Sequence, residues 1–306
     1  MKFAVESWDP GYGRSVGEEG LDDPNEPVDV GVEVDAADWR PLTPPSVTDI
    51  PVLYFVDGVR RTDAQVWVRP PGEDDSLPSI AGVCATVAAG VVECTPGCAR
   101  IVDARVERGF YTSAPHATSI ATKHGTYELR PIVADGDDPL NQAIHSHMTA
   151  VEHQMAAELA RGIVIFDGPL RGRRSPAAVG YVKTQHVQYL PPPQHGVVGR
   201  LDAGQRTPLF LIGGRYNRWS WYLRLPGPIS HPLSGVVRIE LPALGQSSDA
   251  ADRADLISAL LPRFASQPHK DSRAPQNLHP IAGLERELRR RLGDQQLLER
   301  GLRRVS

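Results

Sequence analysis

The chain has 306 residues, of which 41% are hydrophobic and 23% are charged, and its formal net charge at pH 7 is −4. This composition predicts an ordinary globular protein with a sizeable core, built as one large domain with at most an appendage. The slight excess of negative charge argues against a protein that is coated by nucleic acid over a broad surface, although arginines cluster locally.

The chain shows no membrane segment. No apolar run is long enough to span a bilayer, and the N-terminus lacks the apolar stretch of a secretory signal. The three cysteines, Cys84, Cys94 and Cys98, are too few for a disulfide framework or a closed four-ligand zinc site. We therefore expect buried thiols in a protein of the reducing cytoplasm.

The first half of the chain reads mainly as strands. Residues 1–48 are rich in Pro, Gly and Asp and predict an N-terminal arm, with one alternating stretch at 28–34 that fits an edge strand. A domain over 49–293 follows, and 294–306 form a charged C-terminal tail. The expected strands of the first half are 51–57, 64–68, 80–94 with a break at Gly90, 100–106 and 126–133.

The second half mixes helices and strands. Apolar residues from Leu140 to Leu159 recur at helical spacing, which predicts an amphipathic helix over 140–161 that is closed by Gly162. A strand ending at Asp167 follows at once. The later elements are expected to be strands at 179–190, 209–213, 219–225 and 235–241, and helices at 248–261 and 281–292.

One short sequence motif occurs twice in the chain. Two apolar, β-branched runs each end in a carboxylate followed by glycine, at Asp57-Gly58 and at Asp167-Gly168. A buried strand that ends in this way delivers one charged group to the rim of a sheet. A single Asp-Gly pair is also a common turn, but two pairs separated by a helix favour a shared metal site.

The order of these elements predicts the fold class. Strands beginning with one that carries an acid, then a helix, then a strand ending in a second acid are the layout of a ribonuclease H-like α/β domain, a mixed sheet with flanking helices. Two-metal phosphodiester cleavage needs such carboxylates, because Mg²⁺ and Mn²⁺ prefer oxygen ligands and sit roughly 4 Å apart.

The helix between the two acids is expected to supply a third carboxylate. It offers Glu152 and Glu158, which lie on opposite flanks of the apolar stripe, so helical phase does not choose between them. Glu158 is close to the turn at the end of the helix, where a surface carboxylate is ordinary. We therefore prefer Glu152.

Five segments together resemble the NurA nuclease family. They are Val56-Asp57-Gly58, Phe166-Asp167-Gly168-Pro169-Leu170, Gly180-Tyr181-Val182-Lys183-Thr184, Trp221-Tyr222-Leu223-Arg224-Leu225 and Val237-Arg238-Ile239-Glu240-Leu241-Pro242. The resemblance covers residues 50–293. It implies a Mn²⁺- or Mg²⁺-dependent DNA nuclease, a 5′-3′ exonuclease and single-strand endonuclease that acts in DNA end processing or repair.

The resemblance also implies partners and site residues. Members of the family are homodimers that work with a hexameric HerA-type ATPase, which feeds DNA to them. By the family's pattern Asp57, Glu152 and Asp167 would be the catalytic metal ligands. Lys183 would be a further catalytic residue, since an ammonium at the end of an apolar run can neutralise a scissile phosphate. The alternative for Lys183 is a solvent-facing lysine at a strand end.

The last metal ligand departs from the family's pattern. The family often supplies a histidine from a C-terminal helix, after a stretch that here reads Asn277-Leu278-His279-Pro280. The matching helix position holds Glu285, which is a reasonable oxygen ligand, and His279 is a weaker substitute. Glu285 is equally well explained as an exposed charge that pairs with Arg289 at i+4.

Basic residues near the expected rim are candidates for DNA binding. Arg60 and Arg61 follow the first Asp-Gly pair, and Arg171 and Arg173 follow the second. A nuclease needs positive potential only where phosphates run, so this placement matters more than the net charge. Arg224, which lies inside a strand, is a further candidate, with a structural ion pair or a water-facing position as its alternatives.

Two functions from different classes remain open. The first is a metal-dependent deoxyribonuclease that works with a HerA-like ATPase. The second is a catalytically silent adaptor that keeps the fold and binds the ATPase, for which the uncertain last ligand is the support. Both Asp-Gly acids are present, which counts against the adaptor.

Overall fold

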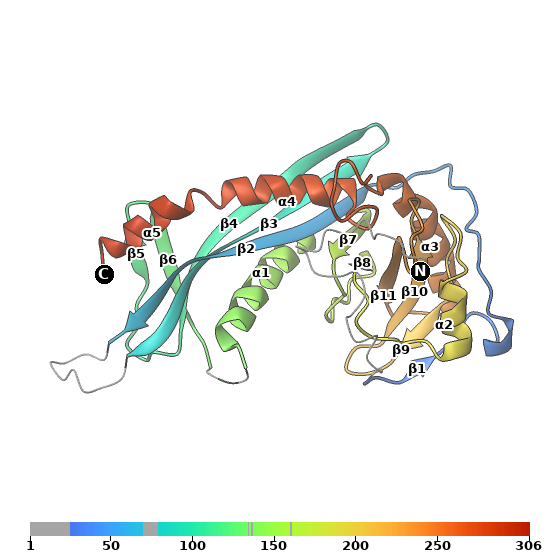
Figure 1. The fold of residues 1–306 in the computed structure, drawn as a ribbon, viewed down its shortest axis with the longest axis horizontal. Helices are drawn as coiled ribbons and strands as arrows, with labels where there is room; N and C mark the ends of the chain where they lie inside the picture. Colours follow the sequence, from blue (N-terminus) through green and yellow to red (C-terminus); the bar gives the residue numbers. More distant parts are fainter. Residues whose placement is uncertain (1–24, 70–78, 134, 136, 160) are drawn as a thin grey trace, which may run out of the picture. The chain divides into compact units, whose positions relative to one another are not determined.

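The computed structural model describes residues 25–69, 79–133, 135, 137–159 and 161–306. Residues 1–24 of the expected N-terminal arm lie outside the described residues. The described residues divide into two compact units (Figure 1). Unit 1 comprises the described parts of Met1–Phe55, Glu93–Ala99 and Arg161–Ala282, and unit 2 those of Val56–Val92, Arg100–Ala160 and Gly283–Ser306.

Strands and helices alternate along the chain much as the sequence predicts. The strands are β1 (Val28–Asp29), β2 (Leu53–Val68), β3 (Ile80–Thr95), β4 (Cys98–Thr112), β5 (Ile120–Thr122), β6 (Gly125–Pro131), β7 (Ile163–Asp167), β8 (Ala178–Val182), β9 (Phe210–Ile212), β10 (Arg218–Arg224) and β11 (Val236–Pro242). The helices are α1 (Pro139–Ala157), α2 (Pro192–Val198), α3 (Ser247–Leu260), α4 (His279–Arg291) and α5 (Gln295–Arg303), with short 3₁₀ turns η2 (Ala36–Asp38) and η3 (Leu261–Phe264).

The strand order confirms the expected α/β class with a mixed sheet. It runs β1-β9-β10-β11-β8-β7-β2-β3-β4-β6-β5. β7 and β8 are parallel, as are β4 and β6, whereas β8, β11, β10 and β9 pair antiparallel in turn. The strand that follows α1, β7, therefore lies beside β2, the strand that carries the first acid. This is the arrangement expected of a ribonuclease H-like domain.

The core of unit 1 includes part of the N-terminal segment. Trp39 is buried in a cluster with Phe210 and Tyr222, and Val28, Val30 and Val34 pack against the same cluster. Nearby, Arg206 is 1% exposed and donates two hydrogen bonds to the carboxylate of Glu33, at 2.9 and 2.7 Å, and one to Asp255 at 2.6 Å. The N–H of Leu209 donates to Glu33 as well, at 2.6 Å. Buried charges are tolerated when they are paired in this way.

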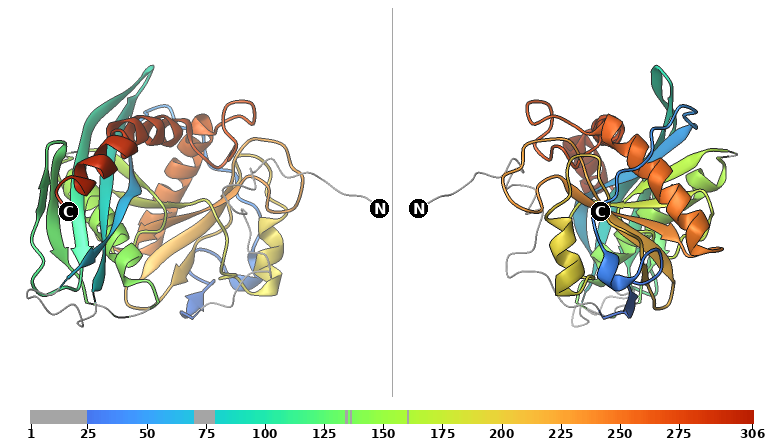
Figure 2. Two further views of the ribbon diagram at one scale, coloured as in Figure 1. Left: turned by 60° about the vertical axis from the view of Figure 1, so that its left-hand side comes forward. Right: turned by 90° about the vertical axis from the view of Figure 1, so that its right-hand side faces the viewer.

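Unit 2 is covered by helices that approach its strands at two glycines (Figure 1, Figure 2). A Cβ atom at Gly90 of β3 would lie 2.7 Å from Leu284 of α4, and one at Gly58 of β2 would lie 2.7 Å from Met148 of α1. Both glycines therefore allow a helix to pack closely on a strand. The expected break at Gly90 is wrong, because β3 is continuous there.

The start of α1 follows from its sequence, but the helix ends at Ala157, four residues before the expected end at 161, and Gly162 belongs to the turn that follows. Asp138 accepts a hydrogen bond from the N–H of Asn141 at 3.1 Å and Pro139 is the first residue of the helix, which is a common start. Gly162 has a φ of +103°, and a Cβ atom there would lie 2.5 Å from the carbonyl oxygen of Val52. Only glycine fits this turn into β7.

Some elements differ from the expectations. The two strands expected at 51–57 and 64–68 are one continuous strand, β2, and the strand expected at 179–190 ends at Val182. Helix α5 lies in the stretch expected to be a charged tail. Its N-cap Asp294 accepts from the N–H of Leu297 at 2.9 Å, and Leu302 packs with Cys84, Phe110 and Tyr127.

The cysteines are free, as expected, but Cys98 is exposed. Burial raises the pKa of Cys84 to about 12 and that of Cys94 to about 11, which keeps both thiols protonated. Among the helices that the structure describes, none combines the length and the apolar character needed to cross a bilayer.

Candidate metal centre

Asp167 stands where the sequence predicts, at the end of a buried strand. β7 pairs in parallel with β8, and the N–H of Gly168 donates to the carbonyl oxygen of Tyr181 at 2.8 Å. Gly168 has a φ of +108°, a conformation that side chains rarely adopt. The chain therefore leaves the sheet at this glycine, and the Asp167 carboxylate remains at the edge.

Lys183 holds the Asp167 carboxylate. Because parallel strands end at the same edge of a sheet, Lys183, which follows β8, reaches Asp167. Its Nζ donates to Asp167 Oδ2 at 2.6 Å and to Asn277 Oδ1 at 3.0 Å. The Lys183 and Asp167 side chains are only 10% and 14% exposed. Burial, reinforced by the charge of Asp167, raises the pKa of the neighbouring Tyr181 well above its usual value.

Asn277 is a member of this cluster whose role the sequence analysis did not identify. It is fully buried, and its Nδ2 donates to Asp271 Oδ2 at 2.8 Å. Asn277 thus links Lys183 to Asp271. The stretch from Asn277 to Pro280 was singled out only for a metal ligand, and no periodicity marks a loop residue of this kind.

Asp57 does not end its strand, contrary to expectation. β2 continues to Val68, and Asp57 is 7% exposed within it and accepts a hydrogen bond from the N–H of Gly58 at 2.8 Å. Gly58 is therefore not a turn residue. Its role is to make room for α1, as described above.

Strand geometry separates Asp57 from Glu152. Successive side chains of a strand point to opposite faces of the sheet. A Cβ atom at Gly58 would lie 2.8 Å from Glu152 Oε1, so the Gly58 face of β2 is the face that α1 covers. Asp57 points to the other face. Glu152 is buried at 6% exposure on α1, and its place in the metal site, which the sequence analysis preferred, stays a prediction that this geometry does not favour.

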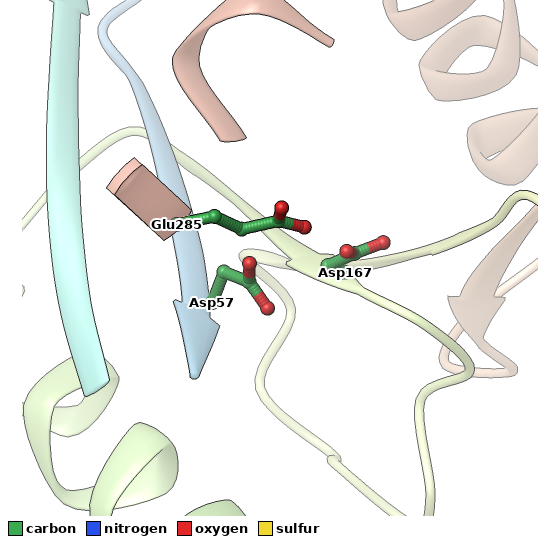
Figure 3. A group of neighbouring side chains, drawn as sticks. All are labelled: Asp57, Asp167 and Glu285. Atoms are coloured by element: carbon green, nitrogen blue, oxygen red, sulfur yellow. The ribbon is translucent and has the colours of Figure 1, made fainter. Parts of the chain in front are cut away.

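Three carboxylates come together in the structure. Asp57, Asp167 and Glu285 each offer an oxygen, and these oxygens all lie within 4.8 Å of one another (Figure 3). Asp57 is buried, whereas Asp167 and Glu285 are partly buried. Glu285 is supplied by α4, the helix that packs on β3 at Gly90. The sequence leaves Glu285 open between a metal ligand and a surface charge, and the structure places it with the two acids.

The other candidate ligands lie elsewhere. Glu158 caps the C-terminal end of α1, is 59% exposed and pairs with Arg105 at 2.6 Å. His279 is exposed at the first position of α4, and it is not among the residues of the carboxylate group.

The candidate DNA-binding arginines differ in their availability. Arg60 and Arg171 are exposed. Arg61 is half-buried and donates to Asp63 and to the carbonyl oxygens of Leu292 and Gly293. These contacts occupy the Arg61 guanidinium within unit 2.

Arg173 and Arg224 are buried and make structural contacts. Arg173 lies 4.0 Å over the Phe166 ring and donates to the carbonyl oxygens of Pro169 and Leu170. Arg224 is 1% exposed and donates to the carbonyl oxygens of several residues, namely Val198, Gly199, Leu201, Pro232 and Ser234. This favours the structural alternative for Arg224 over contact with DNA.

The three carboxylates fit a hard divalent cation. Mg²⁺ and Mn²⁺ take oxygen ligands, usually from a few carboxylates with the remaining positions open to water or to phosphate oxygens. Sulfur and imidazole, which softer metals prefer, are absent from the group of Asp57, Asp167 and Glu285. The donor set thus fits the class of metal that the sequence analysis expects.

No family model matches the chain, and no curated protein matches it. Among solved structures, the chain is similar to the NurA nuclease from Sulfolobus solfataricus, with 11% identity, a TM-score of 0.49 and coverage of 83% of this chain and 84% of that one. It is also similar to the catalytic domain of human Endonuclease V, with 14% identity, a TM-score of 0.34 and coverage of 80% and 85% respectively. Neither similarity reaches the level that would establish a family for this chain.

Proposed function

We propose that this protein is a metal-dependent deoxyribonuclease whose metal site is formed by Asp57, Asp167 and Glu285. The observation that carries the proposal is the approach of these three carboxylates to within 4.8 Å of one another. Converging carboxylates can hold a divalent cation that promotes hydrolysis of a phosphodiester. The cation is Mn²⁺ or Mg²⁺.

The surrounding residues have distinct tasks in this proposal. A bound cation supplies Lewis-acid stabilisation of the charge that develops on the phosphate. Asp57, Asp167 and Glu285 hold the cation through carboxylate oxygens. Lys183 fixes the orientation of Asp167 through its 2.6 Å contact, and its ammonium adds positive charge beside the scissile phosphate. Asn277, which accepts from Lys183, keeps that ammonium in place.

The resemblance of the sequence motifs supports a more specific proposal. The five segments that resemble NurA nucleases include Asp57, Asp167 and Lys183. We therefore propose that the protein is a homodimer that works with a HerA-like hexameric ATPase in the cytoplasm. It would act in DNA end processing or repair as a 5′-3′ exonuclease and single-strand endonuclease.

Cleavage of end-labelled DNA tests the proposal. Purified protein is incubated with linear duplex and with single-stranded DNA while Mn²⁺ or Mg²⁺ is titrated, with and without a HerA-type ATPase. We expect cutting that depends on the metal and that the Asp57→Ala variant loses. Asp49→Ala, which removes an exposed acid just before β2, is the matched control and should cut like the wild type.

The outcomes separate the two functions that the sequence left open. Metal-dependent cutting by the wild type and by Asp49→Ala, but not by Asp57→Ala, would support the nuclease. Failure to cut any DNA at any metal concentration, with and without the ATPase, would refute it and favour the silent adaptor.

A further inference from the structure

A pocket of about 700 Å³ lies within unit 1, beside the loop that follows Asp167. We call it the arginine pocket and define it by Arg174, Tyr189, Arg215, Tyr216, Arg218 and Arg238. Its volume is in the range of ordinary ligand sites. One of its walls is the stretch from Pro169 to Arg174, which begins directly after Asp167-Gly168.

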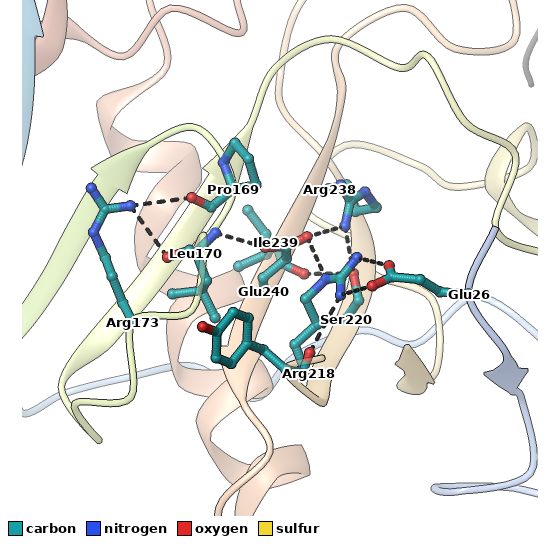
Figure 4. Close-up of polar contacts among 10 residues, drawn as sticks. Glu26, Pro169, Leu170, Arg173, Arg218, Ser220, Arg238, Ile239 and Glu240 are labelled. Carbon is teal, nitrogen blue, oxygen red and sulfur yellow. Dashed lines mark hydrogen bonds and ion pairs between the residues drawn. The ribbon is translucent and has the colours of Figure 1, made fainter. Parts of the chain in front are cut away.

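The charges on the floor of the arginine pocket balance one another (Figure 4). The buried Glu240 accepts hydrogen bonds from Arg238, from Arg218 at 3.2 Å and from the N–H of Leu170 at 2.8 Å. Arg218 also pairs with Glu26 at 2.6 Å. Burial by itself raises the pKa of Glu240, but Arg238, the Leu170 N–H and Arg218 outweigh it and lower the pKa. Two arginines thus face two carboxylates, and the floor has no net charge.

The rim, in contrast, is positively charged. Arg174 and Arg215 are exposed, and each guanidinium lies 5.4 Å from the centre of the Tyr216 ring. Among the residues that the structure describes, no carboxylate forms an ion pair with either arginine. An anion that enters the pocket therefore meets two guanidinium groups that none of the described carboxylates neutralises.

Tyr216 lies close to both arginines and packs against the loop at Gly172. The ring is 37% exposed, and it packs against Gly172, where a Cβ atom would lie 2.8 Å from the ring. Gly172 has a φ of +80°, so the loop can adopt this shape only with glycine or at a cost. The ring thus contacts the backbone at Gly172 and is partly exposed beside the two guanidinium groups.

We propose that the arginine pocket binds single-stranded nucleic acid, with one unpaired base stacked on Tyr216 and the adjoining phosphates paired with Arg174 and Arg215. An aromatic ring flanked by cations is the usual platform for unpaired bases, because every base presents a π-face and every linkage a phosphate. A duplex keeps its bases stacked internally and cannot offer one to the ring. In this proposal the pocket guides the substrate, and that role rests on the proposed nuclease function.

The position of the pocket along the chain supports this role. The wall from Pro169 to Arg174 follows directly after the Asp167-Gly168 turn. Nucleic acid bound on this wall is therefore held in the same unit as Asp167, a candidate catalytic acid. Arg173 stiffens the same wall through its contacts with Phe166, Pro169 and Leu170. A stiff wall holds bound nucleic acid in one position relative to Asp167.

Binding without cleavage is the decisive measurement. The full-length protein in EDTA is titrated into fluorescent oligothymidylate and into a duplex of equal length, and anisotropy is recorded at several salt concentrations. We expect the wild type to bind the single strand more tightly than the duplex. Tyr216→Leu should weaken this binding by about tenfold, the loss of one stacked base, and Tyr216→Phe should bind almost like the wild type.

The arginines are tested by the salt dependence. Replacing both Arg174 and Arg215 by Gln should weaken single-strand binding and reduce the slope of log K against log salt by about 1.4, since each phosphate contact contributes roughly 0.7. Arg304→Gln, at an exposed arginine after α5, is the matched control and should leave the slope unchanged. Circular dichroism checks that each variant is folded.

The results separate this inference from the proposed nuclease. The inference is overturned if the wild type does not prefer the single strand, or if folded Tyr216→Leu and the double arginine variant bind as the wild type does. Cleavage in Mn²⁺ is measured on the same samples. Binding that depends on Tyr216 in a protein that never cuts would refute the nuclease and leave the pocket standing, whereas cutting with unchanged binding would refute only the pocket.

Discussion

The Asp57-Gly58 and Asp167-Gly168 pairs read alike in the sequence but are built differently. At Asp167 the glycine turns the chain out of β7 with a φ of +108°, and nothing lies within 4 Å of where its Cβ would be. At Asp57 the strand continues, and Gly58 leaves room for Met148 and Glu152 of α1. Both carboxylates are proposed to bind the metal. Gly168, however, serves the backbone conformation, whereas Gly58 serves packing.

The largest expected effect comes from the two acids themselves. Asp57→Asn and Asp167→Asn should each lower the rate of DNA cleavage at least about 100-fold, or about 2.7 kcal/mol of transition-state stabilisation, because each removes a charged ligand. Rates in saturating Mn²⁺ measure this. Asp167→Asn should also destabilise the metal-free protein, because the Lys183 ammonium loses its charged partner. A metal-free Asp167→Asn variant as stable as the wild type would contradict this expectation.

The next largest effect is expected at Lys183, which belongs only to the Asp167-Gly168 pair. Lys183→Met should lower the free energy of unfolding by about 3 kcal/mol in EDTA, since the nearly buried Asp167 is left without its counter-charge. Urea unfolding measures the loss. Lys183→Arg is the control that keeps the charge. A Lys183→Met variant as stable as the wild type would mean that the pair contributes nothing to folding.

The third prediction decides whether Glu285 or Glu152 binds the metal together with Asp57 of the Asp57-Gly58 pair. Glu285→Gln should weaken Mn²⁺ binding about tenfold or more, as the loss of one charged ligand, whereas Glu152→Gln on the opposite face of β2 should leave it within about twofold. Isothermal titration in the folded variants measures both. The reverse result would restore Glu152 as the ligand and overturn our assignment.

The smallest expected effects are those of the glycines. Gly58→Ala should destabilise the protein by about 1 kcal/mol through crowding, and Gly168→Ala by about 1 kcal/mol through backbone strain. Thermal unfolding measures both. In a Met148→Ala background, Gly58→Ala should cost less stability than it does in the wild type. Gly168→Ala should cost the same stability in both backgrounds. Equal behaviour in the two double-mutant cycles would show that the glycines have the same role after all.

The sequence predicted the elements whose patterns are local. The start of α1 and the end of β7 are predicted nearly to the residue, because helical periodicity and a proline at the first position are written in the chain, but α1 ends at Ala157 and not at 161. The identity of the third carboxylate was not local. Helical phase shows which side of α1 is apolar, but not which face of β2 that helix covers. The sequence favours Glu152 over Glu158 only because Glu158 lies near the end of the helix, whereas the structure places Glu285 with the two acids.

Other features were missed for related reasons. α5 does carry local signals, the N-cap Asp294 and the buried Leu298 and Leu302 at i, i+4, although its many charges favour a solvated tail. The role of Asn277 depends on Lys183, which lies far from it in the chain. For Asn277 the information is in a tertiary contact and has no local pattern.

The contact of Glu33 with Arg206 bears on how the chain can be shortened. A guanidinium that is 1% exposed receives two of its three carboxylate contacts from a residue in the stretch that the sequence analysis set apart as an arm. A fragment that starts at residue 49 would lack Glu33 and Trp39, and of the carboxylates described here Arg206 would keep only that of Asp255. A fragment that begins at residue 49 should therefore unfold at a lower urea concentration than a fragment that begins at residue 25.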